Sequence, residues 1–399
     1  MFFPKEFNDK KILIFGYGKT GKSVQKYFIK NNINYSIWDD NKKIITTKID
    51  KNYYLKKYDY IILSPGVDIY NHKNKLFFKI HKKNIITDLD IFFLSKQNLK
   101  YIIGITGTNG KSSFCNLLNN LIRKNNLKSR ILGNFGNPVL SENISAEEYC
   151  ILELSSYQLD YSKYIKLDCA CILNVSPDHL ERHGTVEKYK KVKLKIFKFL
   201  KKGGIGLYHN SSFKGFKNKK NIKSFENINK NLIHKILKKN ISISRIDYEA
   251  NRLPHRYEVF LKANNFNFIN DSKSTNFEST RYALKMTPSC ILILGGLLKK
   301  GDNFSLNDLK NRISKTYLFG NDIDPLKQSL KKQKIAFKYF INLKDLLQHV
   351  FSNDLNFRLN KNKKLNVLFS PGAASFDQFK NFEHRGETFK KYVNKFFKR

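Results

Sequence analysis

The stretch YIIGITGTNGKSS, residues 101–113, places a glycine-rich loop between an apolar run and a helix start near Ser112. The apolar run at 101–106 predicts a buried strand. Backbone amides at such a helix start bind phosphate groups, while a lysine and a hydroxyl complete a nucleoside-triphosphate site. The spacing differs from G-x-x-x-x-G-K-S, because Ile105 stands at the first glycine position and Gly107 is the additional glycine.

A carboxylate at the end of a neighbouring strand is the other requirement of a triphosphate site, because it binds the Mg²⁺ that accompanies the phosphates. Glu153 follows the apolar residues of a strand predicted for 149–154 and supplies this carboxylate. We therefore predict that the loop at 106–113 binds ATP. Its candidate ATP-binding residues are Gly107, Thr108, Asn109, Gly110, Lys111, Ser112 and Ser113.

A second stretch, GYGKTGKS at residues 16–23, satisfies both the G-x-G-x-x-G pattern of dinucleotide folds and the pattern G-x-x-x-x-G-K-S. Asp39 and Asp40 follow the glycines by roughly 20 residues, where a Rossmann unit places its ribose-binding acid. The strands after this loop offer no equivalent of Glu153. Residues 16–21 are therefore interpreted as a loop for a nucleoside diphosphate or a dinucleotide, and a tight turn without a ligand is the alternative.

Apolar runs alternate with helical stretches along the chain, which is the pattern of parallel sheets with crossover helices. Three such units are predicted, so the expected fold class is α/β with three domains. The third unit opens with a hairpin whose turn is predicted at Asn264–Asn265. The predicted domains comprise residues 1–97, 98–251 and 252–399.

The 399 residues exceed the size of one ordinary core, and 41% of them are hydrophobic. No window reaches the roughly 18 uninterrupted apolar residues of a membrane span, and the initial MFFPKEFNDKK lacks the apolar stretch of a secretion signal. A cytoplasmic location is expected. The five cysteines form no C-x-x-C pair, which indicates reduced, buried thiols.

The formal net charge of +41 raises the question of nucleic-acid binding, because clustered basic side chains neutralise phosphates. The lysines are instead spread through every segment, together with abundant asparagine and isoleucine. This distribution favours a solvated basic surface over a nucleic-acid-binding module. An anionic small substrate would still be attracted to such a surface.

Motifs from all three predicted domains resemble the Mur ligases, and among them the branch that adds D-glutamate. In chain order they are GITGTNGKSS, GNFGNP, LELSSYQLD, NVSPDHLERHG with YKKVKLKIF, LPHRYE, NDSKSTN, LGGLLKKGDNF and SPGAASFDQFKNFEHRGETF. The motif NDSKSTN identifies the branch, because sister ligases and the related folylpolyglutamate synthases typically carry a histidine-containing motif there. The resemblance implies a Rossmann-like UDP-binding domain, a shortened central P-loop ATPase-like domain and a C-terminal Rossmann-like domain that binds the amino acid.

The resemblance also implies the reaction and its partners. ATP would phosphorylate the carboxylate of UDP-N-acetylmuramoyl-L-alanine, and the amine of D-glutamate would attack the acyl phosphate, in cytoplasmic peptidoglycan precursor synthesis. Cations are needed around the reacting groups, because the γ-phosphate, the substrate carboxylate and the developing oxyanion are all negative. Two Mg²⁺ ions are implied as cofactors, and a monomer without a nucleic-acid partner or a membrane span is the expectation for the family.

The matching motifs imply a role for individual residues. Lys111, His179 and Lys193 would be catalytic, and Lys193 matches a lysine that the family carbamoylates with CO₂. The metal ligands would be Ser112, Glu153, His179 and Lys193. The UDP-substrate would contact Thr20, Asp39, Ser64, Asn134 and Gln158. ATP would also contact Asn231, Arg256, Asp271 and Lys273, and D-glutamate would contact Thr275, Lys299, Ser375 and Phe382.

The chain departs from the family pattern around Asn231. The family usually has a His-Asn pair and a second Asn three residues on, whereas Lys230 and His234 stand here in the other places. The segment between KKGGIGLYHN and this helix is also shorter than usual. Alternatives to the D-glutamate ligase are another Mur-type or folylpolyglutamate-type ligase and a nicotinamide dehydrogenase that uses GYGKTG with Asp39. The dehydrogenase would leave the loop at 106–113 and Lys193 without a role.

Overall fold

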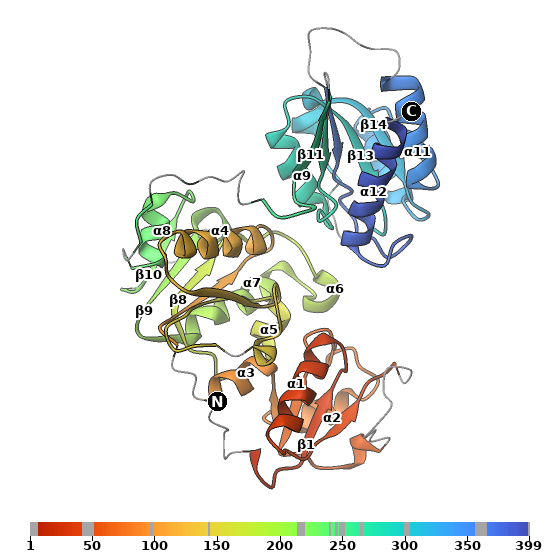
Figure 1. Ribbon diagram of the computed structural model, residues 1–399. Helices are drawn as coiled ribbons and strands as arrows, with labels where there is room; N and C mark the ends of the chain where they lie inside the picture. The colour runs from red at the N-terminus through yellow and green to blue at the C-terminus, as the bar shows by residue number, and fades with distance from the viewer. Residues whose placement is uncertain are drawn as a thin grey trace. The chain divides into compact units, whose positions relative to one another are not determined.

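The computed structural model describes residues 7–41, 52–95, 99–142, 144–213, 220–238, 241–243, 246, 252–263, 266–298, 304–355 and 365–397. The chain divides into two compact units, residues 1–251 and residues 252–399. The first unit contains two β-sheets and the second contains one, each accompanied by helices, as Figure 1 shows.

The first sheet has four parallel strands in the order β2-β1-β3-β4. The strands are β1 (Ile12–Phe15), β2 (Ser36–Trp38), β3 (Tyr60–Leu63) and β4 (Ile85–Ile86), and the helices are α1 (Lys19–Lys30), α2 (Lys75–Ile80) and α3 (Asp88–Leu94). All four residues of β1 are buried, as expected for a parallel strand covered on both faces. The loop between β1 and α1 is therefore held by a rigid strand.

The second sheet has six parallel strands in the order β10-β9-β8-β5-β7-β6. The strands are β5 (Tyr101–Thr106), β6 (Ser129–Gly133), β7 (Tyr149–Glu153), β8 (Leu167–Ile172), β9 (Leu200–His209) and β10 (Ile222–Phe225). The helices are α4 (Lys111–Lys124), α5 (Ser156–Tyr161), α6 (Leu180–His183), α7 (Val186–Leu194) and α8 (Lys230–Ile236). Strand β5 pairs with both β7 and β8, so the loop after β5 lies between the carboxyl ends of its two neighbours, where α/β sheets bind ligands.

The two sheets of the first unit are joined through α3. Thr87 and Asp90 form a capping box at the start of this helix. The Asp90 carboxylate also accepts hydrogen bonds from the backbone amides of Lys163 and Tyr164, each at 2.7 Å. One apolar cluster includes buried side chains of α3 and of both sheets, which makes these parts one unit.

The third sheet has six strands in the order β11-β12-β16-β13-β14-β15, and only β11 runs antiparallel to its neighbour. The strands are β11 (Glu258–Ala263), β12 (Phe266–Asn270), β13 (Cys290–Gly295), β14 (Ile313–Phe319), β15 (Lys338–Phe340) and β16 (Leu365–Phe369). The helices are α9 (Phe277–Met286), α10 (Asp324–Lys332), α11 (Leu343–Val350) and α12 (Phe382–Phe397). Two separate apolar clusters indicate that helices cover both faces of this sheet.

The α/β class and the parallel sheets predicted from the sequence are confirmed. Helix α1 begins at Lys19, directly after its N-cap residue Gly18. The turn predicted at Asn264–Asn265 lies outside the described residues. Strand β15 was not predicted, and it is only three residues long with partly exposed side chains.

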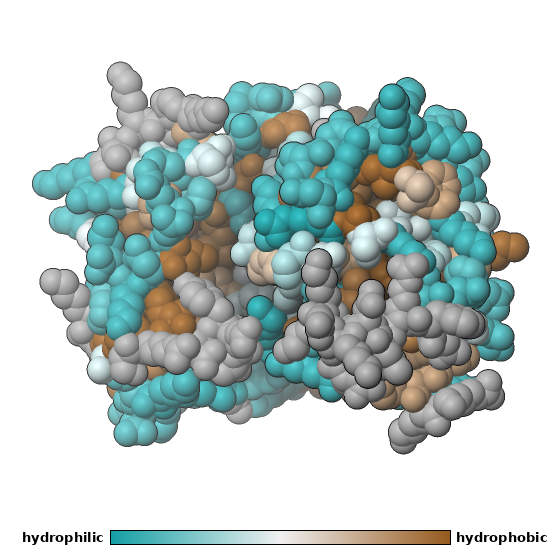
Figure 2. Space-filling model, turned by 90° about the horizontal axis from the view of Figure 1, so that it is seen from above, coloured by the Kyte–Doolittle hydropathy of each residue, from teal (hydrophilic) through white to brown (hydrophobic). Residues whose placement is uncertain are grey.

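Two predictions about composition can be compared with the structure. All five cysteines are buried and none forms a disulfide, which confirms the prediction that they are buried. Hydrophilic residues, drawn in teal, cover much of the face in Figure 2, and hydrophobic residues lie between them. Within the described part of the chain, no helix is both long and apolar enough to span a membrane.

Candidate active site

The loop between β5 and α4 has the backbone shape of a phosphate-binding loop. Gly110 caps α4 in the left-handed conformation, with φ of 79° and no atom near the position of a Cβ. A Cβ on Gly107 would lie 3.2 Å from the Leu173 side chain and 3.4 Å from the backbone of Asn174. Glycine at 107 therefore lets the loop pass close to the end of the neighbouring strand.

Asn174, just beyond β8, fixes the conformation of this loop. Its Oδ1 accepts hydrogen bonds from the amides of Thr108 (3.1 Å) and Asn109 (2.8 Å), and its Nδ2 donates to the Asn109 carbonyl (2.9 Å). The sequence did not single out Asn174. The available signal was its position, because a polar residue that directly follows a buried parallel strand lies at the ligand-binding edge of the sheet.

Two lysines converge on the same loop carbonyl. Lys111 Nζ donates to Gly107 O (2.8 Å) and Thr108 O (2.9 Å), and Lys193 Nζ donates to Gly107 O (2.9 Å). Lys193 comes from α7 and is 1% exposed. Burial, and then the positive charge of Lys111, hold the pKa of Lys193 well below its ordinary value. Lys111 therefore places a positive charge where negative phosphates would be bound, whereas the lowered pKa of Lys193 favours its neutral amine.

Glu153, the last residue of β7, supplies the matching negative group. It is 1% exposed, and its Oε1 accepts a 2.7 Å hydrogen bond from Asn134 Nδ2. Its Oε2 is buried without a hydrogen-bond partner. A buried carboxylate oxygen without a partner is costly unless a cation binds it, and hard cations such as Mg²⁺ prefer oxygen ligands. The residues present therefore fit a divalent cation at this edge of the sheet.

His179 lies at the N-terminus of α6 in the left-handed conformation, with φ of 55°. Its Nδ1 is 2.8 Å from the Tyr157 hydroxyl and 3.4 Å from Glu181 Oε1, and its Nε2 is 3.6 Å from Asp178 Oδ2. The contact with Tyr157 fixes the orientation of the imidazole ring. In the described part of the chain, no group of three His, Cys, Asp or Glu side chains is arranged to hold a metal ion.

The UDP-substrate candidates fall into two groups. Asp39 Oδ2 accepts a 2.6 Å hydrogen bond from the amide of Tyr17, and Ser64 Oγ donates to Gly16 O at 2.7 Å, so both residues contact the first glycine loop. Thr20 lies in the first turn of α1, at the same loop.

The other two UDP-substrate candidates belong to the second sheet. Asn134 binds Glu153, as described above. Gln158 is 3% exposed and completes the capping box of α5 with Ser155. The ATP candidate Asn231 is exposed in the first turn of α8, whose N-cap is Asn229.

The second unit contains the remaining candidates. Asp271 is buried, its Oδ1 accepts from the amide of Tyr257 (2.9 Å), and its Oδ2 accepts from Ser370 Oγ (2.7 Å). Burial raises the pKa of Asp271 to about 6. Lys273 Nζ lies 3.7 Å from the centre of the Phe382 ring. The structure thus uses both carboxylate oxygens of Asp271 in internal hydrogen bonds.

The D-glutamate candidates also lie in this unit. Thr275 is partly exposed, and Ser375 is 2% exposed. Phe382 begins α12, and its carbonyl accepts a hydrogen bond from Ser272 Oγ at 2.8 Å. Lys299 lies outside the described residues.

Arg385, which no sequence pattern singled out as a site residue, is fully buried in this unit. Its guanidinium donates to the carbonyls of Ser272 (2.7 Å) and Ala373 (2.9 Å), and burial lowers its pKa to about 10. It joins the start of the NDSKSTN segment to the SPGAASF segment. A single buried arginine gives no periodic signal in the sequence, so only its long-range contacts reveal this role.

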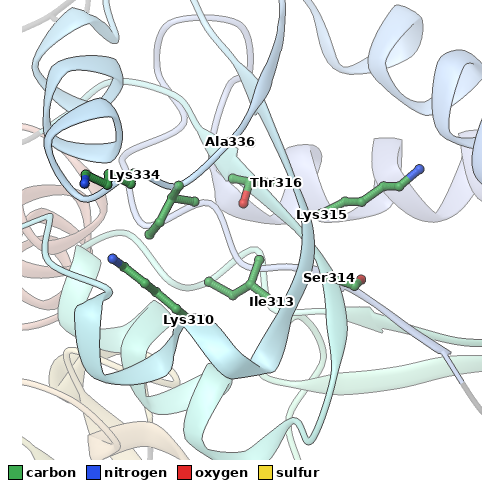
Figure 3. A pocket seen from close by; sticks show the side chains of 8 residues that line it. Lys310, Ile313, Ser314, Lys315, Thr316, Lys334 and Ala336 are labelled. Carbon is green, nitrogen blue, oxygen red and sulfur yellow. The ribbon is translucent and has the colours of Figure 1, made fainter.

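A small pocket of about 190 Å³ lies elsewhere in the second unit, at the amino end of β14 (Figure 3). In the figure Lys315 points away from the other pocket lysines, and its amine contacts Asp354. No site residue predicted from the sequence lines this pocket, so we assign no substrate to it. Its lining residues are Lys310, Ile313, Ser314, Lys315, Thr316, Lys334, Ile335 and Ala336.

Comparison with known proteins places this geometry in a family. Residues 105–269 match the model of the Mur ligase middle domain. The UDP-N-acetylmuramoylalanine–D-glutamate ligase of Francisella philomiragia subsp. philomiragia is 33% identical over 432 residues, which cover 98% of this chain and 99% of the relative. The enzyme of the same name from Francisella tularensis subsp. novicida is 32% identical over 427 residues and 98% of both chains.

Solved structures share the fold at lower identity. The MurF ligase from Thermotoga maritima in complex with ADP has a TM-score of 0.59 and 17% identity, covering 99% of this chain and 97% of that one. The UDP-N-acetylmuramate-alanine ligase MurC from Thermotoga maritima has a TM-score of 0.55 and 12% identity, covering 97% and 99%. With relatives above 30% identity over nearly its full length, the chain belongs to the Mur ligase family, among the UDP-N-acetylmuramoylalanine–D-glutamate ligases.

Proposed function

We propose that the chain joins D-glutamate to the L-alanine carboxylate of UDP-N-acetylmuramoyl-L-alanine, with hydrolysis of ATP to ADP and phosphate. The relatives make it an ATP-dependent ligase of peptidoglycan precursor synthesis. The observation that supports this chemistry most strongly is the unpartnered Glu153 oxygen at the edge of a lysine-rich phosphate loop. A cytoplasmic monomer is part of the proposal.

The proposed reaction has two bond-forming steps. The substrate carboxylate oxygen attacks the γ-phosphorus, an acyl phosphate forms and ADP leaves. The amine of D-glutamate then attacks the acyl carbon, loses a proton, and the C–N bond replaces the C–O bond to phosphate. Lys111, which already lies on the loop, would turn from Gly107 and Thr108 toward the transferred phosphate. A lysine in this position stabilises the charge that develops during transfer.

We propose that Ser112, Glu153, His179 and Lys193 hold two Mg²⁺ ions. When bound, Mg²⁺ would neutralise the phosphates and polarise the transferred group. Glu153 supports the assignment because its Oε2 has no partner, and Asn134 holds the other oxygen in place. His179 is oriented by the hydroxyl of Tyr157.

We also propose that Lys193 is carbamoylated. An ammonium cannot bind a cation, whereas a carbamate offers two oxygens and a negative charge. Burial keeps the Lys193 amine readily deprotonated, and the neutral amine is the form that adds CO₂, with release of one proton. Removal of CO₂ from the buffer should slow turnover and bicarbonate should restore it, while a rate indifferent to CO₂ would contradict the modification.

The remaining assignments complete the proposal. Residues 1–97 would bind UDP through Thr20, Asp39 and Ser64, residues 98–251 would bind ATP, and residues 252–399 would bind the amino acid. Asn134 and Gln158 would meet the sugar-peptide part of the substrate. ATP would also contact Asn231, Arg256, Asp271 and Lys273. D-glutamate would contact Thr275, Lys299, Ser375 and Phe382.

Phosphate release tests the proposed function. Purified protein is given ATP, Mg²⁺ and UDP-N-acetylmuramoyl-L-alanine, together with each amino acid of a panel of D- and L-forms. Release that requires D-glutamate is the expected result. Release that requires a different amino acid would show that the chain is another Mur-type ligase with that amino acid as its acceptor.

A further inference from the structure

Arg182 links the two halves of the first unit. It lies on α6, one helical turn after His179, and its side chain is 5% exposed. Its Nη2 donates to the carbonyl of Val67 at 2.6 Å and contacts the Tyr161 hydroxyl. Val67 belongs to the loop that follows β3 of the first sheet, and this loop also contains Ser64. One buried guanidinium therefore binds both the candidate UDP loop and Tyr161 of α5.

The guanidinium is held between two aromatic rings and an acidic side chain. It lies 4.7 Å from the centre of the Tyr157 ring and 5.3 Å from that of Tyr161. Its Nε is 3.6 Å from Asp68 Oδ1, which is close enough for an ion pair, and it forms no hydrogen bond. Stacking on aromatic faces together with several directed donors suits arginine and not lysine.

The same contacts lead to His179. The Tyr157 ring supports the Arg182 guanidinium, and the Tyr157 hydroxyl is 2.8 Å from His179 Nδ1. The path from the UDP loop to the imidazole thus passes through two side chains, Arg182 and Tyr157. A second link runs beside it, because the Tyr70 hydroxyl donates to Asp160 at 3.1 Å.

We propose that Arg182 is a positioning residue that sets the distance between residues 64–68 and His179. In the proposed reaction, the first site would hold the nucleotide end of the substrate and the second would lie beside the transferred phosphate. Arg182 acts through other residues, because its guanidinium is directed at Val67, Tyr161 and Asp68. The inference rests on the proposed function, since both sites take their roles from it.

The kinetic test uses Arg182→Lys, which keeps the charge and loses the planar donors. We expect kcat to fall about 10–100-fold, because small misplacements of reacting groups slow the reaction. The Kd for UDP should stay within about threefold of the wild-type value. The decrease in kcat should appear with whichever amino acid the wild-type protein accepts. An error in the D-glutamate assignment would therefore show in the wild-type protein and would not affect this test. Tyr161→Phe, which removes only the hydroxyl that Arg182 contacts, should lower kcat less than Arg182→Lys.

The matched control is Arg130→Lys. Arg130 is also a partly buried arginine of the second sheet, bound to Glu142 and Glu148, and it belongs to neither proposed site. We expect its kcat to equal that of the wild type. An unchanged kcat in Arg182→Lys, or equal losses in both variants, would overturn the positioning role.

Amide hydrogen exchange gives a readout that does not depend on activity. Arg182→Lys should speed exchange about tenfold or more in residues 64–70 and in residues 176–183 together, because one side chain holds both segments. Faster exchange in only one segment would overturn the link. Since exchange is measured on the free protein, it decides the inference even if the proposed reaction is wrong.

Discussion

The two glycine-rich loops of the first unit share the letters G-K-S at a helix start but differ in their surroundings. In the loop at 106–113, Lys111 binds two loop carbonyls, and the nearby Glu153 keeps one buried oxygen without a partner. In the loop at 16–23, Lys22 is exposed and lies 5.8 Å from the Tyr17 ring.

The carboxylates near the two loops explain the difference. Both oxygens of Asp39 accept backbone hydrogen bonds, from Tyr17 at 2.6 Å and Asn41 at 2.8 Å, so this carboxylate shapes its own loop. Glu153 Oε2 has no such partner and fits a cation. We therefore expect the two similar sequence patterns to bind different ligands, because the Asp39 carboxylate is used within its own loop whereas Glu153 keeps one oxygen without a hydrogen-bond partner.

The largest effect that separates the loops is expected from Lys111→Ala. We predict that kcat falls about 10²–10³-fold, because the transferred phosphate loses its fixed cation. The matched variant Lys22→Ala should keep kcat within about threefold, since an exposed charge is screened by solvent. Steady-state phosphate release measures both. Equal losses in the two variants would show that the loops do not divide the substrates as proposed.

A smaller effect is expected from Glu153→Gln. The Mg²⁺ concentration needed for half-maximal activity should rise about 10–100-fold, since a charged ligand is lost. Without metal, the variant should melt at a higher temperature, because an unpartnered buried carboxylate is removed. The control is Glu148→Gln, whose carboxylate pairs with Arg130 at 3.0 Å. An unchanged Mg²⁺ requirement would remove Glu153 from the metal site.

Asp39→Asn should affect only the first loop. Loss of the charge-assisted hydrogen bond from Tyr17 N is expected to raise the Kd for UDP-N-acetylmuramoyl-L-alanine about tenfold, which is about 1.4 kcal/mol. The Kd for ATP should be unaltered. Calorimetric titration of each ligand checks both values, and a weaker ATP affinity would indicate that the loops act together.

Asp88→Asn should leave both loops unchanged and alter stability alone. Burial raises the pKa of Asp88 to about 7, and its Oδ1 has no partner. Because the folded-state pKa exceeds the unfolded one, folding is favoured by the proton, and this contribution is full at low pH and is lost as pH rises through about 7. Urea unfolding should find the variant more stable than wild type at pH 8 but not at pH 4. Equal differences at both pH values would contradict this.

Features that follow from a local sequence pattern could be predicted from the sequence. It identified the strand, loop and helix at 101–113, the carboxylate of Glu153 and the parallel sheets. It did not identify Asn174, Arg182 or Arg385, because their contacts join segments far apart in the chain and have no period. The structure also gives Asp271 internal partners that the motif alone did not suggest.

Titration of Lys111→Ala with both substrates most directly tests the assignment of ATP to the loop at 106–113 and of the UDP-substrate to the loop at 16–23. We predict that UDP-N-acetylmuramoyl-L-alanine binds with the wild-type Kd while the affinity for ATP with Mg²⁺ is weakened at least tenfold, or about 1.4 kcal/mol. Loss of UDP-substrate binding with ATP binding intact would contradict the assignment of ATP to the loop at 106–113.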